Sequence, residues 1–214
     1  MDSTDIAAMR RDYQLAALDE ATAGDNPVSL FQKWFDEAIA AQIDEVNAMT
    51  LATAGTDGQP HARIVLLKGL EPEGFVFFTN YESNKGHQLA ENHRAALLFF
   101  WKELERQVRI EGRVQLLDAA ASDAYYHSRP EGSQIGAWAS PQSQVIPGRE
   151  ALQQRVAEVA ATFKDKAVQR PHFWGGYLLQ PETIEFWQGR ASRLHDRILF
   201  MRAQEGWQKV RLAP

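Results

Sequence analysis

The alternation of apolar and polar residues divides the chain into a helical beginning and a longer stretch of strands. After Ser29, apolar residues recur at three- and four-residue spacing as far as Ile39, which predicts an amphipathic helix with Ser29 as its N-cap. From Met49 onward the pattern changes to short apolar runs separated by turns such as the one at Gly58. The pattern therefore predicts an N-terminal helical segment over about residues 1–45, followed by β-structure.

Short runs rich in aliphatic and aromatic residues predict the strands. They span residues 49–54, 61–67, 74–80, 95–101, 107–117, 176–179, 185–188, 198–202 and 207–211. Two helices are expected between them, over residues 118–127 and 149–164. Short strands at regular spacing favour a mainly β fold with flanking helices (α+β), in which a nearly closed antiparallel barrel carries helices outside. No repeat or low-complexity linker divides the chain, so a single domain over residues 1–214 is expected.

Composition removes several classes of protein. The 214 residues are 44% hydrophobic, which suffices for a core without disulfides, and no cysteine is available as a nucleophile or metal ligand. The net charge of −5 argues against a nucleic-acid-binding protein. The charged N-terminus lacks an apolar core, and no apolar run is long enough to span a membrane, so we expect no membrane association and a cytoplasmic location.

The familiar catalytic and cofactor motifs are absent. There is no G-x-G-x-x-G turn, P-loop or G-x-S-x-G elbow, so a dinucleotide fold and a serine hydrolase are not expected. The six histidines do not have the spacing of a metal site, so no metal is expected either.

Three segments place cations beside aromatic or hydroxyl side chains. Arg63 and Lys68 point to opposite faces of one predicted strand, because side chains alternate along a strand. Residues 125–133 combine tyrosine, arginine and serine, which are good donors to a phosphate dianion. Residues 186–197 place arginines and a histidine next to a tryptophan, which favours an anionic planar ligand. We expect the end of this segment to be extended, so that alternation places Arg193, His195 and Arg197 on one face. Solvated surface charges and ordinary polar loops would account for the same residues.

A series of short strings in these segments carries a resemblance to a known family. The strings are Arg63-Ile-Val-Leu-Leu-Lys68, Phe77-Phe-Thr-Asn80, Ser83-Asn-Lys-Gly-His-Gln88, Leu104-Glu-Arg-Gln-Val108, Tyr126-His-Ser-Arg-Pro130, Ser133-Gln-Ile-Gly-Ala-Trp138, Phe173-Trp-Gly-Gly176, Glu185-Phe-Trp-Gln-Gly189, Arg193-Leu-His-Asp-Arg197 and Arg211-Leu-Ala-Pro214. In this order they resemble the pyridoxine (pyridoxamine) 5'-phosphate oxidase family, whose members bind FMN in an antiparallel split β-barrel. The resemblance runs from about residue 10 to the last residue.

The resemblance implies a role for particular residues. The FMN-binding set that it implies is Arg63, Ile64, Val65, Leu66, Leu67, Lys68, Phe78, Thr79, Lys85, Gln107, Gln142, Ser143, Trp187 and Arg197, with Arg63, Lys85, Gln142 and Ser143 at the FMN phosphate. The substrate-binding set is Arg10, Tyr13, Lys68, Tyr125, Arg129, Ser133, Arg193 and His195. Of these, Arg193 and His195 would lie over the pyridine ring as the catalytic pair, and Arg10 and Tyr13 match a segment that closes over the substrate.

The resemblance also implies the reaction and the partners. The expected activity is FMN-dependent oxidation of pyridoxine 5'-phosphate and pyridoxamine 5'-phosphate to pyridoxal 5'-phosphate, with oxygen as electron acceptor giving hydrogen peroxide. A homodimer with FMN at the subunit interface is implied as well. One position departs from the family, because Asn84 stands where a second basic residue often precedes the equivalent of Lys85. With Asn84 the FMN phosphate would have one cation fewer, which concerns FMN affinity more than function.

Two other interpretations remain open on the sequence. A flavin reductase-like enzyme of the same fold would keep the flavin-lining residues but would not need Tyr125, Arg129, Ser133, Arg193 and His195 together. A carrier or sensor that binds FMN or pyridoxal phosphate would bind the same ligands without turnover. Turnover of the bound substrate in air distinguishes both from the oxidase.

Overall fold

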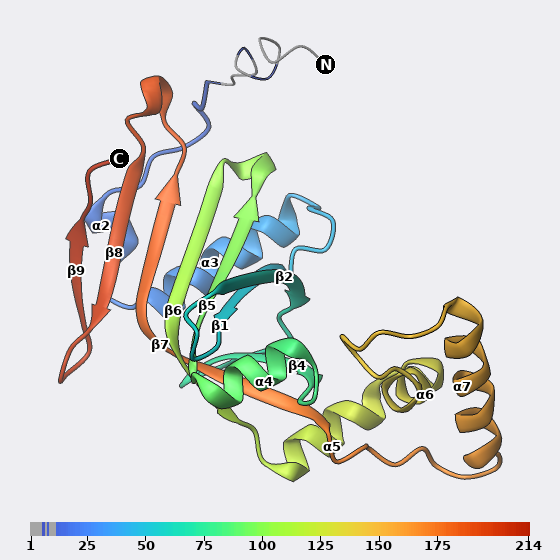
Figure 1. Ribbon diagram of the computed structural model, residues 1–214. Helices are drawn as coiled ribbons and strands as arrows, with labels where there is room; N and C mark the ends of the chain where they lie inside the picture. The colour runs from blue at the N-terminus through green and yellow to red at the C-terminus, as the bar shows by residue number, and fades with distance from the viewer. Residues whose placement is uncertain (1–5, 7, 9–11) are drawn as a thin grey trace. The chain divides into compact units, whose positions relative to one another are not determined.

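The computed structural model describes Ile6, Ala8 and residues 12–214 (Figure 1). The chain divides into two compact units. The terminal unit contains both ends of the chain and consists of residues 1–49, 97–111 and 181–214. The central unit consists of residues 50–96 and 112–180. Arg10, which the sequence assigns to the substrate, lies outside the described residues.

In the described part of the chain, nine strands form the sheet. They are β1 (Ala48–Ala54), β2 (Pro60–Leu66), β3 (Gly69–Glu71), β4 (Gly74–Asn80), β5 (Arg94–Trp101), β6 (Arg106–Leu116), β7 (Trp174–Gln188), β8 (Asp196–Arg202) and β9 (Trp207–Arg211). The hydrogen-bonded order is β2-β1-β5-β6-β7-β4-β3, with β8 paired to β7 and β9 paired to β8. The pairs β3–β4, β4–β7, β7–β8 and β8–β9 are antiparallel, which confirms the predicted mainly β, antiparallel fold with flanking helices.

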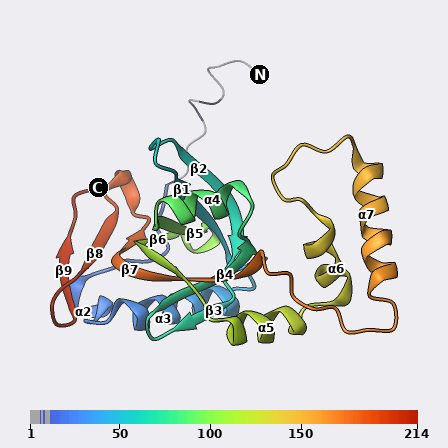
Figure 2. The ribbon, with the colours of Figure 1, turned by 60° about the horizontal axis from the view of Figure 1, so that its bottom comes forward.

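Six helices accompany the sheet in the part of the chain that is described. They are α2 (Glu20–Ala23), α3 (Pro27–Ala40), α4 (Asn84–Glu91), α5 (Ala119–Ser128), α6 (Glu131–Ala139) and α7 (Arg149–Thr162), with 3₁₀ turns at Lys102–Leu104 and Ala191–Arg193. Within the central unit, α6 and α7 lie side by side (Figure 2). None of the helices over the described residues has the length and apolar character that a membrane crossing requires.

The predicted first helix is present, but its N-cap is not Ser29. The side chain of Asn26 accepts hydrogen bonds from the backbone N–H groups of Val28 and Ser29, and Pro27 occupies the first helical position. Proline suits that position because its missing N–H would have no partner within the helix. The apolar face of α3 then packs in the terminal unit, where Phe31 meets Phe99 with ring centroids 5.0 Å apart.

Strand β7 differs most from its predicted form. Two short strands were expected near residues 176–179 and 185–188, yet β7 is one strand of 15 residues. Its first part pairs with β4 from Trp174 to Leu179, and its second part pairs with β8 from Thr183 to Gln188. Pro181 falls between these two sets of pairs, so its missing N–H removes no hydrogen bond to either strand.

Three elements were not predicted: β3, α4 and α6. The sequence around Pro130 suggested a polar loop, whereas α6 begins directly after this proline. A proline next to the first turn is compatible with a helix start, so the same residues serve either structure. The eight-residue α4 is the element that brings Lys85 into the site described next.

Candidate functional site

A cavity of about 550 Å³ lies within the central unit and collects most of the predicted ligand-binding residues. The predicted residues in its lining are Arg63, Ile64, Val65, Leu66, Lys68, Phe78, Thr79, Lys85, Tyr125, Arg129, Ser133 and Gln142. They come from β2, β4, α4, α5 and α6 and from the connections between these elements. The volume is in the range of small-molecule and cofactor sites.

Lys85 lies in the lining of the cavity. Its Nζ donates to Thr79 Oγ1 at 3.1 Å, Ser83 Oγ at 3.3 Å and Gln142 Oε1 at 2.6 Å, all of which are neutral acceptors. Burial and the nearby positive charge of Arg63 lower the pKa of Lys85 to about 8. An anion placed here would relieve both effects.

The position of Lys85 depends on how closely α4 approaches the turn after β4. Ser83 caps α4 by accepting a hydrogen bond from the N–H of Gly86. A Cβ at Gly86 would lie 2.1 Å from the backbone oxygen of Tyr81, so only glycine allows this approach. The sequence string around Lys85 therefore reflects the packing of the helix as well as the charge.

Arg63 is fixed beside Lys85 by three hydrogen bonds. Its Nη1 donates to the backbone oxygen of Leu51 at 3.0 Å and to Thr53 Oγ1 at 2.6 Å, and its Nη2 donates to Gln88 Oε1 at 3.3 Å. Burial lowers the pKa of this guanidinium. Over the described residues, no carboxylate forms a salt bridge with Arg63 or Lys85, so two like charges share this part of the cavity without a counter-ion.

Stacked aromatic rings form another part of the lining. The rings of Phe78 and Tyr125 stack at 3.8 Å between centroids, with planes 20° apart, and Trp174 lies nearly parallel to Tyr125 at 6.2 Å. The guanidinium carbon of Arg129 lies 4.5 Å from the centroid of Trp174, within the range of a cation–π interaction. Trp174 was not assigned to the site from the sequence, although it lies in the quoted Phe-Trp-Gly-Gly string.

Arg129 carries a buried donor with no partner. It stands at the C-terminal end of α5, and its backbone oxygen accepts a hydrogen bond from Gln134 Nε2 at 2.8 Å. Its Nη1, however, is buried and makes no hydrogen bond. Burial also lowers the pKa of Arg129. Because an unsatisfied buried donor on a charged group is costly, this atom indicates a place for an acceptor that the chain itself does not supply.

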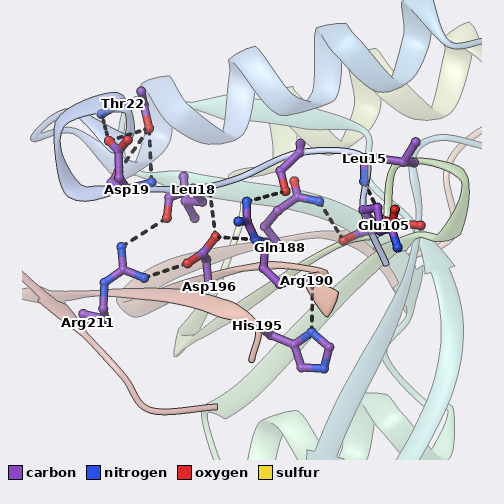
Figure 3. A network of polar contacts seen from close by, with 12 residues as sticks. Leu15, Leu18, Asp19, Thr22, Glu105, Gln188, Arg190, His195, Asp196 and Arg211 are labelled. Atoms are coloured by element: carbon purple, nitrogen blue, oxygen red, sulfur yellow. Dashed lines mark hydrogen bonds and ion pairs between the residues drawn. The ribbon is translucent and has the colours of Figure 1, made fainter. Parts of the chain in front are cut away.

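The terminal unit contains a second group of predicted residues. The rings of Trp187 and His195 lie 4.6 Å apart, and Tyr13 meets both edge-on at 5.8 and 5.9 Å. The backbone N–H of Arg190 donates to Nδ1 of His195 at 3.1 Å, which assigns the proton of a neutral imidazole to Nε2 (Figure 3). Burial and the charge of Arg193 lower the pKa of His195, which favours this neutral form.

The segment around Arg193 is not extended as predicted. Residues Ala191–Arg193 form a 3₁₀ turn, in which Ser192 and Arg193 have φ values of 55° and 62°. The alternation that was expected to place Arg193, His195 and Arg197 on one face therefore holds only from β8 onward, since β8 begins at Asp196. Arg193 is exposed and lies at the end of this turn, before β8 begins.

Ion pairs surround Arg197 in the terminal unit. Its Nε donates to Glu185 Oε1 at 2.7 Å, and its Nη1 donates to the backbone oxygen of Ala213 at 2.9 Å. Glu185 also accepts from Arg109 Nη2 at 2.5 Å. Burial alone would raise the pKa of Glu185, but the hydrogen bonds from Arg197 and Arg109 outweigh it and leave the pKa below its usual value.

The remaining predicted residues lie outside the cavity lining. Leu67 is buried, Ser143 is exposed with φ at 71°, and Gln107 is half-buried in β6 of the terminal unit. The sequence did not single out the residues that complete the lining or hold Arg63, namely Asn80, Pro130, Trp174, Thr53 and Gln88. No pattern of spacing marks these side chains, because their roles depend on the approach of separate elements. The described residues contain no cluster of three or more potential metal ligands.

Two family models match the chain. Residues 35–163 match the model described as pyridoxamine 5'-phosphate oxidase. Residues 174–214 match the model described as the pyridoxine 5'-phosphate oxidase C-terminal dimerisation region.

Curated proteins resemble the chain over its full length. A pyridoxine/pyridoxamine 5'-phosphate oxidase from Cupriavidus pinatubonensis is 57% identical over 212 residues, which cover 99% of this chain and 100% of the relative. The pyridoxine/pyridoxamine 5'-phosphate oxidase 1 of Ralstonia nicotianae is 58% identical with the same coverage.

Solved structures share the fold. PhzG from Burkholderia lata 383, in complex with tetrahydrophenazine-1-carboxylic acid, aligns with a TM-score of 0.87 and 31% identity, covering 94% of this chain and 99% of that one. A pyridoxamine 5'-phosphate oxidase-related, FMN-binding protein from Nostoc punctiforme aligns with a TM-score of 0.69 at 16% identity, covering 86% of this chain and 97% of that one. The two family models and the full-length relatives together show that the chain belongs to the pyridoxamine 5'-phosphate oxidase family.

Proposed function

We propose that the protein is an FMN-dependent oxidase that converts pyridoxine 5'-phosphate and pyridoxamine 5'-phosphate to pyridoxal 5'-phosphate in vitamin B6 metabolism. The observation that carries the proposal is one cavity in which Arg63 and Lys85 form no salt bridge with a carboxylate of the described residues and Arg129 has an unsatisfied buried donor. Two phosphates of about −1.5 to −2 charge each would satisfy these groups. The curated relatives carry the name of this activity.

The phosphate of FMN belongs at Arg63 and Lys85. Both cations are already oriented by neutral hydrogen-bond acceptors, so an incoming phosphate meets preformed donors. Gln142, which bonds to Lys85, and its neighbour Ser143 complete this group. In the central unit, the proposed flavin contacts are residues 64–68 of β2 and the loop that follows, together with Phe78 and Thr79. In the terminal unit, the proposed flavin contacts are Gln107, Trp187 and Arg197.

The phosphate of the substrate belongs at Arg129. Its unpartnered Nη1 is the donor, and Lys68, Tyr125 and Ser133 line the same cavity. The aromatic stack of Phe78, Tyr125 and Trp174 offers flat surfaces beside that donor. A planar phosphorylated pyridine fits this combination of a charged end and a flat wall.

Arg193, His195, Tyr13 and Arg10 are assigned to the substrate ring. A neutral His195 with its proton on Nε2 can donate one hydrogen bond to a ring substituent, while Nδ1 stays bonded to the N–H of Arg190. The guanidinium of Arg193 supplies a planar cation for the same ring. Such positioning can account for several kcal/mol of a reaction barrier.

FMN supplies the hydride acceptor that the side chains of this protein lack. In the overall reaction, the alcohol of pyridoxine 5'-phosphate loses two electrons and two protons to become the aldehyde, and molecular oxygen takes them up as hydrogen peroxide. With pyridoxamine 5'-phosphate the same loss gives an imine, which water hydrolyses to the aldehyde and ammonia. The protein contributes binding, orientation and a neutral imidazole near the reacting carbon.

A homodimer with FMN at the subunit interface is part of the proposal. The match of residues 174–214 to a dimerisation region supports it. Ile64 and Leu116, which are 65% and 59% exposed on β2 and β6, are large apolar side chains of the kind that a partner subunit covers.

The test combines spectroscopy with turnover. The purified protein should bind FMN and be yellow, and this flavin colour should bleach when pyridoxine 5'-phosphate is added without oxygen and return when air is admitted. Unphosphorylated pyridoxine is the matched control and should bleach it far more slowly. Binding without bleaching would indicate a carrier, and equal rates with both compounds would show that no substrate phosphate is recognised; either result contradicts the proposal.

A further inference from the structure

The segment from Asp12 to Leu18 has no regular secondary structure, yet its backbone is bound to side chains from distant parts of the terminal unit. The N–H groups of Gln14 and Leu15 both donate to Glu105 Oε2, at 2.9 and 3.1 Å. The N–H of Leu18 donates to Asp196 Oδ2 at 3.1 Å (Figure 3). Carboxylates thus hold the segment at two points. We name residues 12–18 the N-terminal strap.

Two arginines and a backbone amide add further bonds to the strap. Arg190 Nη1 donates to the oxygen of Ala16, and Arg211 Nη2 donates to the oxygen of Leu18, each at 3.1 Å. The N–H of Ser192 donates to Asp12 Oδ1 at 3.3 Å. These donors belong to the turn before His195 and to β9, so the strap is fixed to the same turn that carries the proposed catalytic residues.

Glu105 is an unusual residue in this arrangement. Its carboxylate belongs to a residue only 2% exposed, and its backbone adopts a left-handed conformation with φ at 54°. Both features are unfavourable for a glutamate unless the surroundings compensate. The two strap N–H groups are part of that compensation. The backbone oxygen of Glu105 also accepts from the N–H of Gly189 at 2.8 Å and from Gln188 Nε2 at 3.2 Å. Glu105 therefore connects the strap to the end of β7.

Tyr13 is the strap residue that meets the proposed site. Its ring touches Trp187 and His195, and it occupies the space beside Gly189. A Cβ at Gly189 would lie 2.8 Å from Cγ of Tyr13 and 2.9 Å from its Cβ. The tyrosine ring is thus confined by the strap on one side and by a backbone without a side chain on the other.

We infer that Glu105 and Asp196 are positioning residues that clasp the N-terminal strap and so hold Tyr13 against His195. Glu105 acts at the N-terminal half of the strap, next to Tyr13. Asp196 acts at its end, and it follows His195 directly in the chain while Arg211 Nη1 bonds its other oxygen at 2.9 Å. The inference rests on the proposed function for its kinetic consequence, but the clasp itself is a property of the strap amides.

Hydrogen exchange tests the clasp without reference to activity. In the purified holoprotein, Glu105→Gln should speed exchange of the Gln14 and Leu15 amides by about tenfold or more, because a charge-assisted hydrogen bond becomes a weaker one. Asp196→Asn should have the same effect at Leu18. Glu103→Gln, in the exposed part of the same turn, is the matched control and should leave all three amides unchanged. Unchanged exchange at Gln14 and Leu15 in Glu105→Gln would overturn the inference, and if that variant does not fold, unchanged exchange at Leu18 in Asp196→Asn would do so.

Kinetics test what the clasp does. Glu105→Gln should lower kcat/KM for pyridoxine 5'-phosphate by about tenfold at unchanged FMN content, by the loss of a charge-assisted bond. If Glu105 acts through Tyr13, the double variant Glu105→Gln/Tyr13→Ala should be no slower than Tyr13→Ala alone. If the loss of kcat/KM in the double variant equals the product of the losses in the two single variants, Glu105 does not act through the strap. If the wild-type protein fails to oxidise the phosphorylated vitamers, the proposed function fails, while the exchange result still decides the clasp.

Discussion

Cations have opposite surroundings in the two units of this protein. In the central cavity, the hydrogen bonds of Arg63 and Lys85 to described residues all go to neutral acceptors, and Arg129 leaves a buried donor unused. In the terminal unit, arginines are paired with carboxylates: Arg109 and Arg197 with Glu185, and Arg211 with Glu20 and Asp196. The difference separates cations that complete the fold from cations that await a ligand.

The pKa shifts follow the same division. Pairing raises the pKa of Arg211, chiefly through its hydrogen bonds with Glu20. Burial lowers the pKa values of Arg63, Lys85 and Arg129, because it disfavours their charged forms, and the charge of Arg63 adds to the effect on Lys85. Three such buried charges in one cavity lower the free energy of unfolding of the apoprotein, and a bound anion can offset this loss.

Breaking a pair in the terminal unit should have the largest effect. Glu185→Gln leaves Arg197 and Arg109 facing a neutral group in a nearly buried position, and removing one partner of a buried ion pair typically costs about 3–5 kcal/mol. Thermal unfolding of the apoprotein should show a Tm lower by roughly 10 °C. Glu205→Gln, in the exposed turn between β8 and β9, should leave Tm unchanged. A loss of stability below about 1 kcal/mol would mean that the paired arginines do not stabilise the fold.

Removing a cation from the cavity should affect the ligand and spare the fold. Arg129→Ala should raise KM for pyridoxine 5'-phosphate by about tenfold to a hundredfold, since a charge-assisted contact is worth about 1.5–3 kcal/mol. Apoprotein stability should change by at most about 2 kcal/mol, because Nη1 has no hydrogen-bond partner and the guanidinium loses mainly its cation–π contact with Trp174. Arg149→Ala, an exposed change in the same unit, serves as control. Lost FMN with an unchanged KM would show that the two phosphate pockets have been exchanged.

The titration of Lys85 should make FMN affinity depend on pH. The lysine is charged below its pKa of about 8 and loses its proton above it, whereas the phosphate is already a dianion at pH 7. FMN binding should therefore weaken by about tenfold between pH 7 and pH 9, as measured by quenching of flavin fluorescence. In Lys85→Arg the charge persists, and the affinity should be nearly constant over this range. A wild-type affinity that does not fall above pH 8 would contradict the assignment.

Adding a cation beside Lys85 should have the smallest effect. Asn84 is exposed at the start of α4, next to Lys85. Asn84→Arg should tighten FMN binding by about 0.5–1 kcal/mol, the value of a partly exposed charge pair. Titration of the apoprotein measures this directly, with Asn84→Gln as the neutral control. Equal or weaker binding in Asn84→Arg would indicate that the phosphate already has its full complement of charge.

The sequence predicted the elements with strong periodicity and the residues within them. Strand β4 has the predicted bounds, and α5 and α7 differ from prediction by at most two residues. Helix α6 was not predicted, because Pro130 and Gly132 are as compatible with a loop as with the start of a helix. β7 was divided at Pro181 because local pattern does not show where a strand changes partners.

The site was predictable to the extent that its residues belong to continuous strings. Arg63, Lys85 and Arg129 were found in this way, and the structure places them around one cavity. Thr53 lies in none of these strings, and Gln88 ends one without being given a role, because both matter through their bonds to Arg63 across separate elements. The turn at Arg193 was also missed, since no residue type in Ala191–Arg193 requires a left-handed backbone.

The neutral surroundings of Lys85 have a practical consequence for handling the protein. A preformed cationic pocket does not distinguish the phosphate of FMN from inorganic phosphate in a buffer, so the two should compete. Apoprotein prepared in phosphate should melt at a higher temperature than in a zwitterionic buffer of equal ionic strength, and it should take up FMN more slowly. The rate of reconstitution thus depends on the choice of buffer salt, and preparations that differ only in that salt will differ in flavin content.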